Sequence, residues 1–410
     1  MENVKERFLR YIKIDTQSCD GVEQFPSTEK QLDLARLLES ELCAMGASDV
    51  TLDKNGYLFA TIPSNIDREV PTVGFISHMD TAPAYSGKGV NPQIASDYDG
   101  GELVLNAETG IKMSPAMFPS LSRYKGKELI YTDGSTLLGA DDKAGVAEIM
   151  TMAEYLLTHP EIKHGEIKIG FTPDEEVGRG ADFFDVERFG ARVAYTVDGG
   201  ELGEIEYENF NAAAGLLTVH GASIHPGSAK GKMKNAILIG AEFEALLPAF
   251  DKPMYTEGYE GFFHLDRIEG DVENCRMEYI IRDHDAVKFE EKCRIFKRAG
   301  DWLNEKYGEG TVDVKVTESY RNMREMVEPH MYLIDIAKKA MTNCGAEPKI
   351  VAIRGGTDGA RLSYMGLPCP NLSTGGENFH GKYEFICTQS METMVEVLTD
   401  IAKQFTEIGR

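Results

Sequence analysis

The sequence predicts an α/β protein: a main domain with a mostly parallel sheet, interrupted by a smaller α+β domain. Helix and strand patterns alternate through the first 210 residues, which is typical of a parallel sheet with covering helices. From about residue 213 to residue 324 the order becomes β-α-β-β-α-β, the ferredoxin-like arrangement. After residue 324, helix and strand patterns like those of the first 210 residues resume. We therefore expect a discontinuous main domain of residues 1–212 and 325–410, with an inserted lid domain of residues 213–324.

The first well-marked element of the main domain is a helix over residues 26–46. Thr28 and Gln31 match a capping box at its start, and Gly46 is placed to end it. Its apolar residues recur at helical spacing, at Leu34, Leu37, Leu38 and Leu42. The pattern indicates a helix with one buried face.

Three apolar strands of the main domain run into charged or imidazole side chains. The strands are predicted at residues 72–78, 166–173 and 193–197. A helix with an apolar stripe is predicted at 146–157, between the first and second of these strands. The first strand ends in His78, the second precedes Glu175, and the third precedes Asp198. The carboxyl ends of strands are where α/β sheets bind ligands, so these side chains share one predicted location.

The inserted domain has its own set of elements. Strands are expected at 214–221, 261–270, 275–285 and 311–319, and helices at 233–250 and 285–308. After the insertion, a helix is predicted at 327–345 and a strand at 370–376. These resumed patterns lead to His380, which lies in a glycine-containing loop.

Composition excludes several functional classes. A chain of 410 residues with 42% hydrophobic and 27% charged residues is globular and long enough for two domains. Its net charge of −24 disfavours nucleic acid and anionic membrane surfaces, both of which require basic faces. We therefore expect neither a nucleic-acid partner nor a membrane partner.

Cysteine usage and the N-terminus indicate a cytoplasmic location. The seven cysteines are scattered and form no CxxC pair, so reduced thiols are the simplest account. The first residues, MENVKERFLRYIK, carry charges throughout and lack the apolar core of a signal peptide. No apolar run is long enough to span a bilayer.

The most informative feature is a set of five candidate metal ligands at strand ends or in glycine-rich turns. They are His78 in FISHMD, Asp141 in LLGADDKAG, Glu176 in FTPDEEVG, Asp198 in YTVDGG and His380 in GGENFHGKYEF. Two imidazoles and three carboxylates suit a pair of divalent ions bridged by one carboxylate. Two zinc-type ions that share a water would make the protein a hydrolase. Because His380 completes the set, the inserted domain must interrupt the catalytic one.

Each motif taken alone has a simpler explanation. Asp80 faces the same side of an extended chain as His78 and could orient its ring, but an isolated H-x-D is weak. The acids around Asp141 could merely cap a helix, although Asp141 itself fits a bridging ligand. Glu176 is assigned as a ligand and Glu175 as the general base, and the order of residues alone does not separate the two. The metal centre is predicted from the motifs together.

These motifs give the chain a resemblance to a known family. It resembles, essentially end to end, the di-zinc metallopeptidases that include carboxypeptidase G and the succinyl-diaminopimelate desuccinylase. The ligand and base pattern is shared by that whole family, and HPGSAKG with TEGYEGFFHL is similar to its tripeptide-aminopeptidase branch. The resemblance implies two Zn²⁺ per subunit, with Co²⁺ or Mn²⁺ as substitutes, since all three metals accept nitrogen and oxygen ligands.

The resemblance also implies how the ligands divide between the two ions. Asp141 bridges them, His78 and Asp198 bind one, and Glu176 and His380 bind the other. Glu175 is the base and Asp80 supports His78. A cis peptide bond is expected between Asp141 and Asp142.

Three residues outside the ligand set are expected to contact a peptide substrate. The equivalent of His225 helps bind the scissile carbonyl oxygen in related enzymes, and in dimeric relatives it comes from the partner subunit, which would require a homodimer. Without the resemblance, His225 would be a turn histidine before Pro226. Arg282 and Arg354 suit a peptide's terminal carboxylate, and the alternative for each is a structural ion pair.

The expected function is that of a tripeptide aminopeptidase acting on small peptides. A dipeptidase or an N-acyl-amino-acid hydrolase of the same family would use the same metals with a different pocket. A non-catalytic peptide-binding scaffold is the remote alternative, which loss of the base or a ligand would have favoured. No such loss is present in the sequence.

Overall fold

The structure, a computed structural model, describes residues 2–408. These residues form two compact units. Among the described residues, the first comprises 2–207, 325–351 and 357–408, and the second comprises 208–324 and 352–356. The short segment 352–356 therefore belongs with the insertion, although it lies far beyond it in sequence.

The first unit is built on an eight-stranded sheet with the order β1-β2-β8-β3-β9-β16-β10-β15. The strands at its centre, β8, β3, β9 and β16, are parallel to one another, as predicted. Antiparallel pairs flank them, namely β1 with β2, β2 with β8 and β10 with β16. The strands are β1 (Ser48–Leu52), β2 (Leu58–Ile62), β3 (Val73–His78), β8 (Ile167–Thr172), β9 (Val193–Gly199), β10 (Glu204–Asn209), β15 (Lys349–Ile353) and β16 (Asn371–Ser373).

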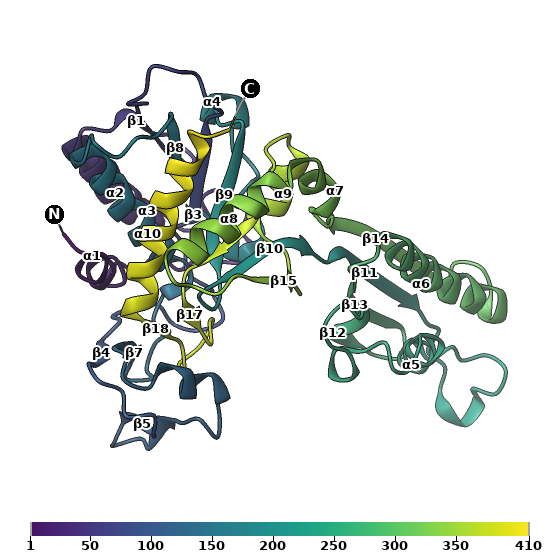
Figure 1. The fold of residues 1–410 in the computed structure, drawn as a ribbon. Helices are drawn as coiled ribbons and strands as arrows, with labels where there is room; N and C mark the ends of the chain where they lie inside the picture. Colours follow the sequence, from purple (N-terminus) through teal and green to yellow (C-terminus); the bar gives the residue numbers. More distant parts are fainter. Residues whose placement is uncertain (1, 409–410) are drawn as a thin grey trace. The chain divides into compact units, whose positions relative to one another are not determined.

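Helices cover this sheet (Figure 1). The helices of the unit are α1 (Val4–Tyr11), α2 (Gln31–Met45), α3 (Ala140–Thr158), α4 (Val186–Phe189), α8 (Tyr332–Asn343), α9 (Asp358–Tyr364) and α10 (Thr388–Phe405). Helix α3 packs on β3 and β9, and α10 packs on α3 and α8. The Tyr195 hydroxyl donates to the backbone oxygen of Leu333 in α8 (2.7 Å). Side chains alternate along a strand, so Ala194, the neighbour of Tyr195 in β9, points to the opposite face of the sheet. There it packs in a cluster with Phe184, Phe189 and Leu362.

The start of helix α2 differs from the predicted capping box. The helix begins at Gln31, after Lys30, without a capping hydrogen bond from a side chain. The Thr28 hydroxyl donates instead to the backbone oxygen of Gln17 (2.8 Å), and the Gln31 amide turns inward to Asp174 (2.6 Å). A distant buried carboxylate therefore competes successfully for the glutamine side chain. The predicted end is correct, since Gly46 has a left-handed φ of 89°.

Residues 85–135 form strands that sequence reasoning did not predict. A second, four-stranded sheet has the order β17-β18-β7-β4, and β5 pairs with β6. Their bounds are β4 (Pro92–Ala95), β5 (Leu103–Asn106), β6 (Ile111–Met113), β7 (Leu129–Thr132), β17 (Gly376–Glu377) and β18 (Phe385–Cys387). This sheet brings the segment after His380 against residues 129–131.

The second unit has the predicted ferredoxin-like order. Its elements are β11 (Asn211–His220), α5 (Ala236–Leu246), β12 (Phe262–Gly270), β13 (Asn274–Asp283), α6 (Ala286–Tyr307) and β14 (Val312–Tyr320). The short helix α7 (Arg324–Val327) follows, where the chain returns to the first unit. The sheet order is β12-β13-β11-β14, and each neighbouring pair of strands is antiparallel. A core that includes Leu217, Phe243, Tyr279 and Phe296 lies between the sheet and the two long helices.

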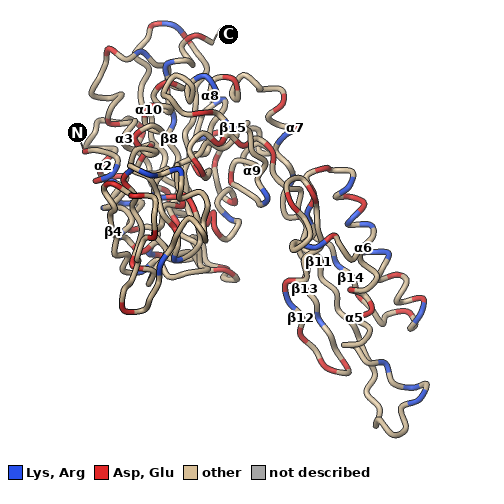
Figure 2. The backbone as a smooth tube through the Cα atoms, turned by 60° about the horizontal axis from the view of Figure 1, so that its bottom comes forward, with Lys and Arg blue, Asp and Glu red and all other residues tan. Residues whose placement is uncertain are grey.

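Charged residues are spread over both units. Figure 2 shows acidic positions interspersed with basic ones along the whole chain. Acidic residues outnumber basic ones 67 to 43, so the net charge is strongly negative. Among residues 2–408, no helix is both long enough and apolar enough to cross a membrane.

Candidate metal centre

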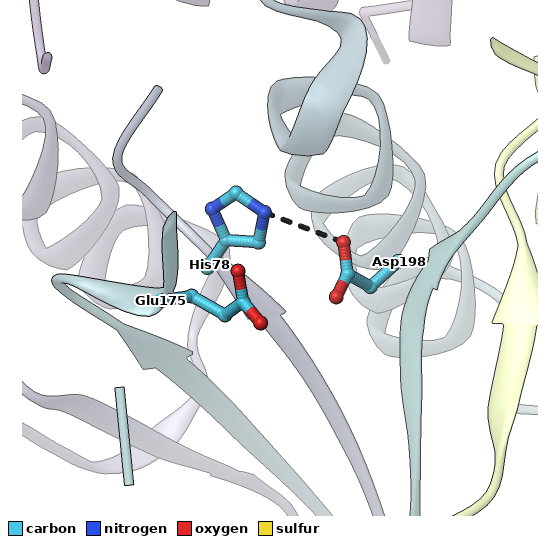
Figure 3. A group of neighbouring side chains, drawn as sticks. All are labelled: His78, Glu175 and Asp198. Carbon is cyan, nitrogen blue, oxygen red and sulfur yellow. Dashed lines mark ion pairs between the residues drawn. The ribbon is translucent and has the colours of Figure 1, made fainter. Parts of the chain in front are cut away.

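The parallel strands β8, β3 and β9 bring three predicted site residues together. His78 is the last residue of β3, Asp198 lies near the end of β9, and Glu175 follows β8 by three residues. Because the strands are neighbours and parallel, their carboxyl ends meet at one edge of the sheet. Figure 3 shows the side chains of Glu175 and Asp198 directed toward the His78 ring. Facing oxygen and nitrogen atoms of these residues lie within 4.8 Å of one another.

Asp141 lies between the two predicted histidine ligands. Its Oδ1 is 2.9 Å from Nε2 of His78, and its Oδ2 is 2.9 Å from Nε2 of His380. On one side, His78 Nε2 is also 3.3 Å from Oδ1 of Asp198. On the other, His380 Nε2 is 3.1 Å from Oε2 of Glu176. All five predicted ligands therefore form one continuous cluster with Asp141 at its centre.

The carboxylates and imidazoles of this cluster alter one another's ionisation. Hydrogen bonds to Asp141 and Glu176 raise the pKa of His380 to about 11. Burial opposes a charge on His78, but Asp198 and Asp141 outweigh burial and raise its pKa. Burial, with repulsion from Asp141, raises the pKa of Glu176 to about 7. The cluster concentrates negative charge that an added cation would stabilise.

Glu175 has a different environment from its neighbour. Burial is the main cause of its raised pKa, and the nearby Asp198 carboxylate adds to the effect. A carboxyl group with a raised pKa, directed into a cluster of ligands, suits proton transfer. Glu176, in contrast, contacts His380 and lies opposite Asp141.

The residues present fit divalent metal ions. Imidazole nitrogens and carboxylate oxygens are the ligands that zinc-type ions accept. Glu176 Oε1 is buried without a hydrogen-bond partner among the described residues, so one strong acceptor is left for another group. His78, Asp141 and Glu176 also present atoms within 4.8 Å of one another. The donor chemistry and the unpaired oxygen both favour a metal cofactor.

Asp80 supports this cluster in two ways, of which the sequence indicated one. His78 Nδ1 lies 3.0 Å from the backbone oxygen of Asp80 and 3.3 Å from its Oδ1, as expected for an orienting residue. The fully buried carboxylate also accepts hydrogen bonds from the backbone N–H groups of Glu175 (3.0 Å) and Glu176 (3.2 Å). Asp80 thus connects the end of β3 to the turn that carries both glutamates.

Two further buried carboxylates hold the segment around Asp141. Glu384, which sequence reasoning missed, accepts hydrogen bonds from the backbone N–H groups of Leu138, Gly139 and Asp141 at 2.7–3.1 Å. Asp142 accepts from the Ser77 hydroxyl and from the backbone N–H of His78 (3.1 Å). The peptide bond between Asp141 and Asp142 is cis, as expected. The acid in GKYEF was the only sequence signal for Glu384, and its partners lie about 240 residues away.

The three predicted substrate residues all belong to the second unit. His225 is exposed in a turn, where its Nδ1 accepts from the backbone N–H of Gly227 (3.2 Å). Arg282 donates to the backbone oxygen of Arg354 (2.9 Å), so these two lie together. Arg354 itself donates to the backbone oxygen of Gly258. Neither arginine forms an ion pair with the residues the structure describes, so the structural alternative of an ion pair is not met.

Comparison with known proteins identifies the family. The model of peptidase family M20/M25/M40 matches residues 133–404, more than half of the chain. The chain belongs to peptidase family M20/M25/M40. It is a peptidase, as the sequence predicted, and peptides are therefore its substrates.

Relatives within the M20/M25/M40 family match the whole chain. Peptidase T from Alkaliphilus oremlandii is 57% identical over 409 residues, covering 99% of this chain and 100% of the relative. The crystal structure of aminopeptidase PepT from Bacillus cereus has a TM-score of 0.78 at 25% identity and covers 98% of both chains. That of a tripeptidase from Staphylococcus aureus has a TM-score of 0.79 at 22% identity, covering 99% and 98%. The expected aminopeptidase activity agrees with these relatives.

Proposed function

We propose that this peptidase removes the N-terminal residue from tripeptides, with a water activated at a pair of divalent metal ions. The observation that carries the proposal is the position of Asp141, whose two oxygens face two different histidines. A carboxylate placed in this way is suited to bridge two ions. The likeness to peptidase T over the full chain and the tripeptidase among the structural relatives support the substrate class.

The candidate ligands would be shared between the two ions according to which side chains contact each histidine. His78 and Asp198 would hold one ion, Glu176 and His380 the other, and Asp141 both. Asp80 accepts at Nδ1 of His78, which leaves Nε2 as the nitrogen available to a metal. Zinc is the proposed metal, with Co²⁺ or Mn²⁺ as substitutes. When bound, two such ions lower the pKa of a water and polarise a carbonyl group.

Glu175 performs the proton transfers in this proposal. Its carboxylate takes the proton of the attacking water and later delivers it to the leaving amine. Glu175 lies beside His78 and Asp198 (Figure 3), at one end of the cluster of candidate ligands, and this position supports its proposed role as the base. The two backbone hydrogen bonds from residues 175 and 176 to Asp80 fix the turn from which it projects.

Residues of the second unit recognise the peptide. Arg282 and Arg354 would bind its terminal carboxylate, since the guanidinium groups form no ion pair with described residues. Nε of Arg282 is also buried without a partner. His225 would bind the oxygen of the scissile carbonyl and stabilise the developing negative charge. Its exposure leaves it free to act within its own subunit or across a homodimer.

All seven cysteines are free thiols, which supports a cytoplasmic location.

A matched substrate panel under zinc tests the proposal. It comprises a free tripeptide, its N-acetylated form, the dipeptide, the tetrapeptide and an N-acyl amino acid, with release of the first residue measured. Selective cleavage of the free tripeptide is the expected result. Preference for the dipeptide or the acyl amino acid would overturn the tripeptide assignment while keeping the metal mechanism. No turnover with metal bound would favour a peptide-binding scaffold.

A further inference from the structure

The residue before the proposed base has an unusual backbone conformation. Asp174 is fully buried between the end of β8 and Glu175, and its φ is 57°, in the left-handed region. A residue with a Cβ adopts this conformation less readily than glycine does. Asp174 lies in the turn between the end of β8 and Glu175. The conformation of Asp174 therefore decides where the Glu175 side chain begins.

Two residues from a distant segment surround the Asp174 side chain. Its Oδ2 accepts from the backbone N–H of Ser27 (2.6 Å), and its Oδ1 accepts from the Ser27 hydroxyl (2.5 Å) and from Nε2 of Gln31 (2.6 Å). The Gln31 amide also accepts, at Oε1, from the backbone N–H of Asp174 (3.1 Å). One glutamine amide thus contacts both the backbone and the side chain of Asp174.

A second anchor lies immediately after Asp174. The Asp80 carboxylate accepts from the N–H groups of Glu175 and Glu176. The backbone of Glu175 is therefore fixed on one side by Asp80 and on the other by the contacts of Ser27 and Gln31 with Asp174. Gln31 and Ser27 are both buried, and their hydrogen bonds within the described residues do not involve a candidate metal ligand.

We propose that Gln31 and Ser27 are positioning residues for the base, acting through Asp174. The inference rests on the proposed role of Glu175 and adds that residues 27–31 set its position. Reacting groups must be placed closely, and a displacement of about 1 Å can cost about 100-fold in rate. Loss of these contacts should therefore lower kcat more than it changes KM.

Exchanging the donor and acceptor groups tests the contact directly. Gln31→Glu places two carboxylates against each other, and Asp174→Asn places two amide NH₂ groups against each other. The double variant Gln31→Glu/Asp174→Asn restores a donor–acceptor pair with reversed polarity and unchanged total charge. The amide oxygen introduced at position 174 then faces the Ser27 N–H, and the new NH₂ group faces the carboxylate introduced at position 31. We expect each single change to lower kcat about 10- to 100-fold and the double variant to recover most of it.

The variant Asp174→Gly distinguishes the role of the backbone conformation at residue 174 from the role of its side-chain contacts. Glycine adopts a left-handed φ without cost, so this variant keeps the turn accessible and removes the side-chain contacts. We expect its kcat to fall as in the single variants. Full activity of Asp174→Gly would show that Asp174 serves only the backbone conformation, which would overturn the proposal.

Four further readouts distinguish positioning from a general loss of structure. KM, metal content and melting temperature should stay close to those of the unchanged protein. Amide hydrogen exchange should rise at residues 174–176 in the single variants and return in the double variant. Gln404→Glu is the matched control, because Gln404 makes a similar Nε2-to-carboxylate bond (2.8 Å to Asp400) on α10. A fall in kcat proportional to metal loss, or no recovery in the double variant, would overturn the inference.

Glu175→Gln in the same assay separates this inference from the proposed function. If Glu175→Gln stays active, Glu175 is not the base and the proposed mechanism fails. If Glu175→Gln is inactive while Gln31→Glu and Asp174→Asn are fully active, only the positioning role is wrong.

Discussion

At the scale of single residues, the proposed mechanism gives the two adjacent glutamates separate tasks. Their order in the sequence did not distinguish ligand from base, and we base the assignment on their different contacts. Glu176 lies 3.1 Å from His380 and has one unpaired buried oxygen, whereas Glu175 is grouped with His78 and Asp198. The account therefore assigns metal binding to Glu176 and proton transfer to Glu175.

Paired amide substitutions test this division. We expect Glu175→Gln to lower kcat about 10²–10⁴-fold with unchanged metal content, because a general base contributes about that much. Glu176→Gln should lose metal as well as activity, because it removes a charged ligand. Steady-state kinetics and metal analysis of both variants provide the measurement. Metal loss in Glu175→Gln with metal retained in Glu176→Gln would mean that the assignments are reversed.

Sequence reasoning found the residues that lie in a recognisable local motif and missed those whose role depends on contacts with distant segments. The five candidate ligands could be proposed from the sequence because each is a metal-binding residue type beside a strand end or a glycine-rich turn. Glu384 and Gln31 could not, because their role depends on contacts with residues 143 or more positions away in sequence. A residue's own motif indicates its chemistry, but only the fold shows which distant backbone it holds.

At the scale of elements, helix α3 approaches β9 closely at Gly145. A Cβ built there would lie 2.0 Å from the backbone oxygen of Val197 and 2.6 Å from Oδ1 of Asp142. Neither a backbone atom nor the side chain of Asp142, which contacts Ser77, can move away easily. Glycine is thus required where helix α3 passes β9, the strand that carries Asp198.

Gly145→Ala should therefore destabilise the protein. Overpacking typically costs about 1–3 kcal/mol, and a clash with backbone belongs at the upper end. Chemical denaturation measures the change in the free energy of unfolding. Gly381→Ala, at a glycine with no neighbouring atom within 4 Å, is the control. Equal stability of the two variants would contradict the close approach.

Strand β10 contains a carboxyl group that should make stability depend on pH. Burial raises the pKa of Glu206 from 4.5 to about 8, with a further contribution from Glu204. Between these two pH values the unfolded chain releases this proton while the folded chain retains it. The contribution of Glu206 to the free energy of unfolding therefore falls as pH rises from 4.5 to 8 and is constant above 8.

Glu206→Gln removes this titration. Relative to the unchanged protein, the variant should become progressively more stable between about pH 5 and about pH 8. Denaturation curves at several pH values measure the difference. A difference that does not change with pH would show that Glu206 is not held in its neutral form by the fold.

At the scale of the whole molecule, the two units differ in how far sequence predicted them. The ferredoxin-like order of the second unit followed from its regular strand and helix patterns, and the parallel centre of the first unit from its apolar strands. The sheet β17-β18-β7-β4 was missed, because its strands have two to four residues and join distant segments. Short strands carry too few residues for an alternating pattern to be recognised.

Metal removal should lower the stability of the whole protein. The cluster brings three carboxylates together, and a bound cation would relieve their repulsion. A ligand at about 1,000 times its Kd stabilises a fold by about 4 kcal/mol. We expect the melting temperature to fall after chelation and to recover on addition of Zn²⁺. An unchanged melting temperature after verified metal removal would contradict the account.

The most direct test of the central claim is the metal stoichiometry of the unchanged protein and of Asp141→Ala. A titration of the metal-free protein with Zn²⁺, followed by calorimetry and elemental analysis, measures it. If Asp141 bridges two ions, the unchanged protein should bind two per chain, and Asp141→Ala should weaken both sites together. One ion per chain, or two ions that bind Asp141→Ala as tightly as before, would contradict the two-metal centre.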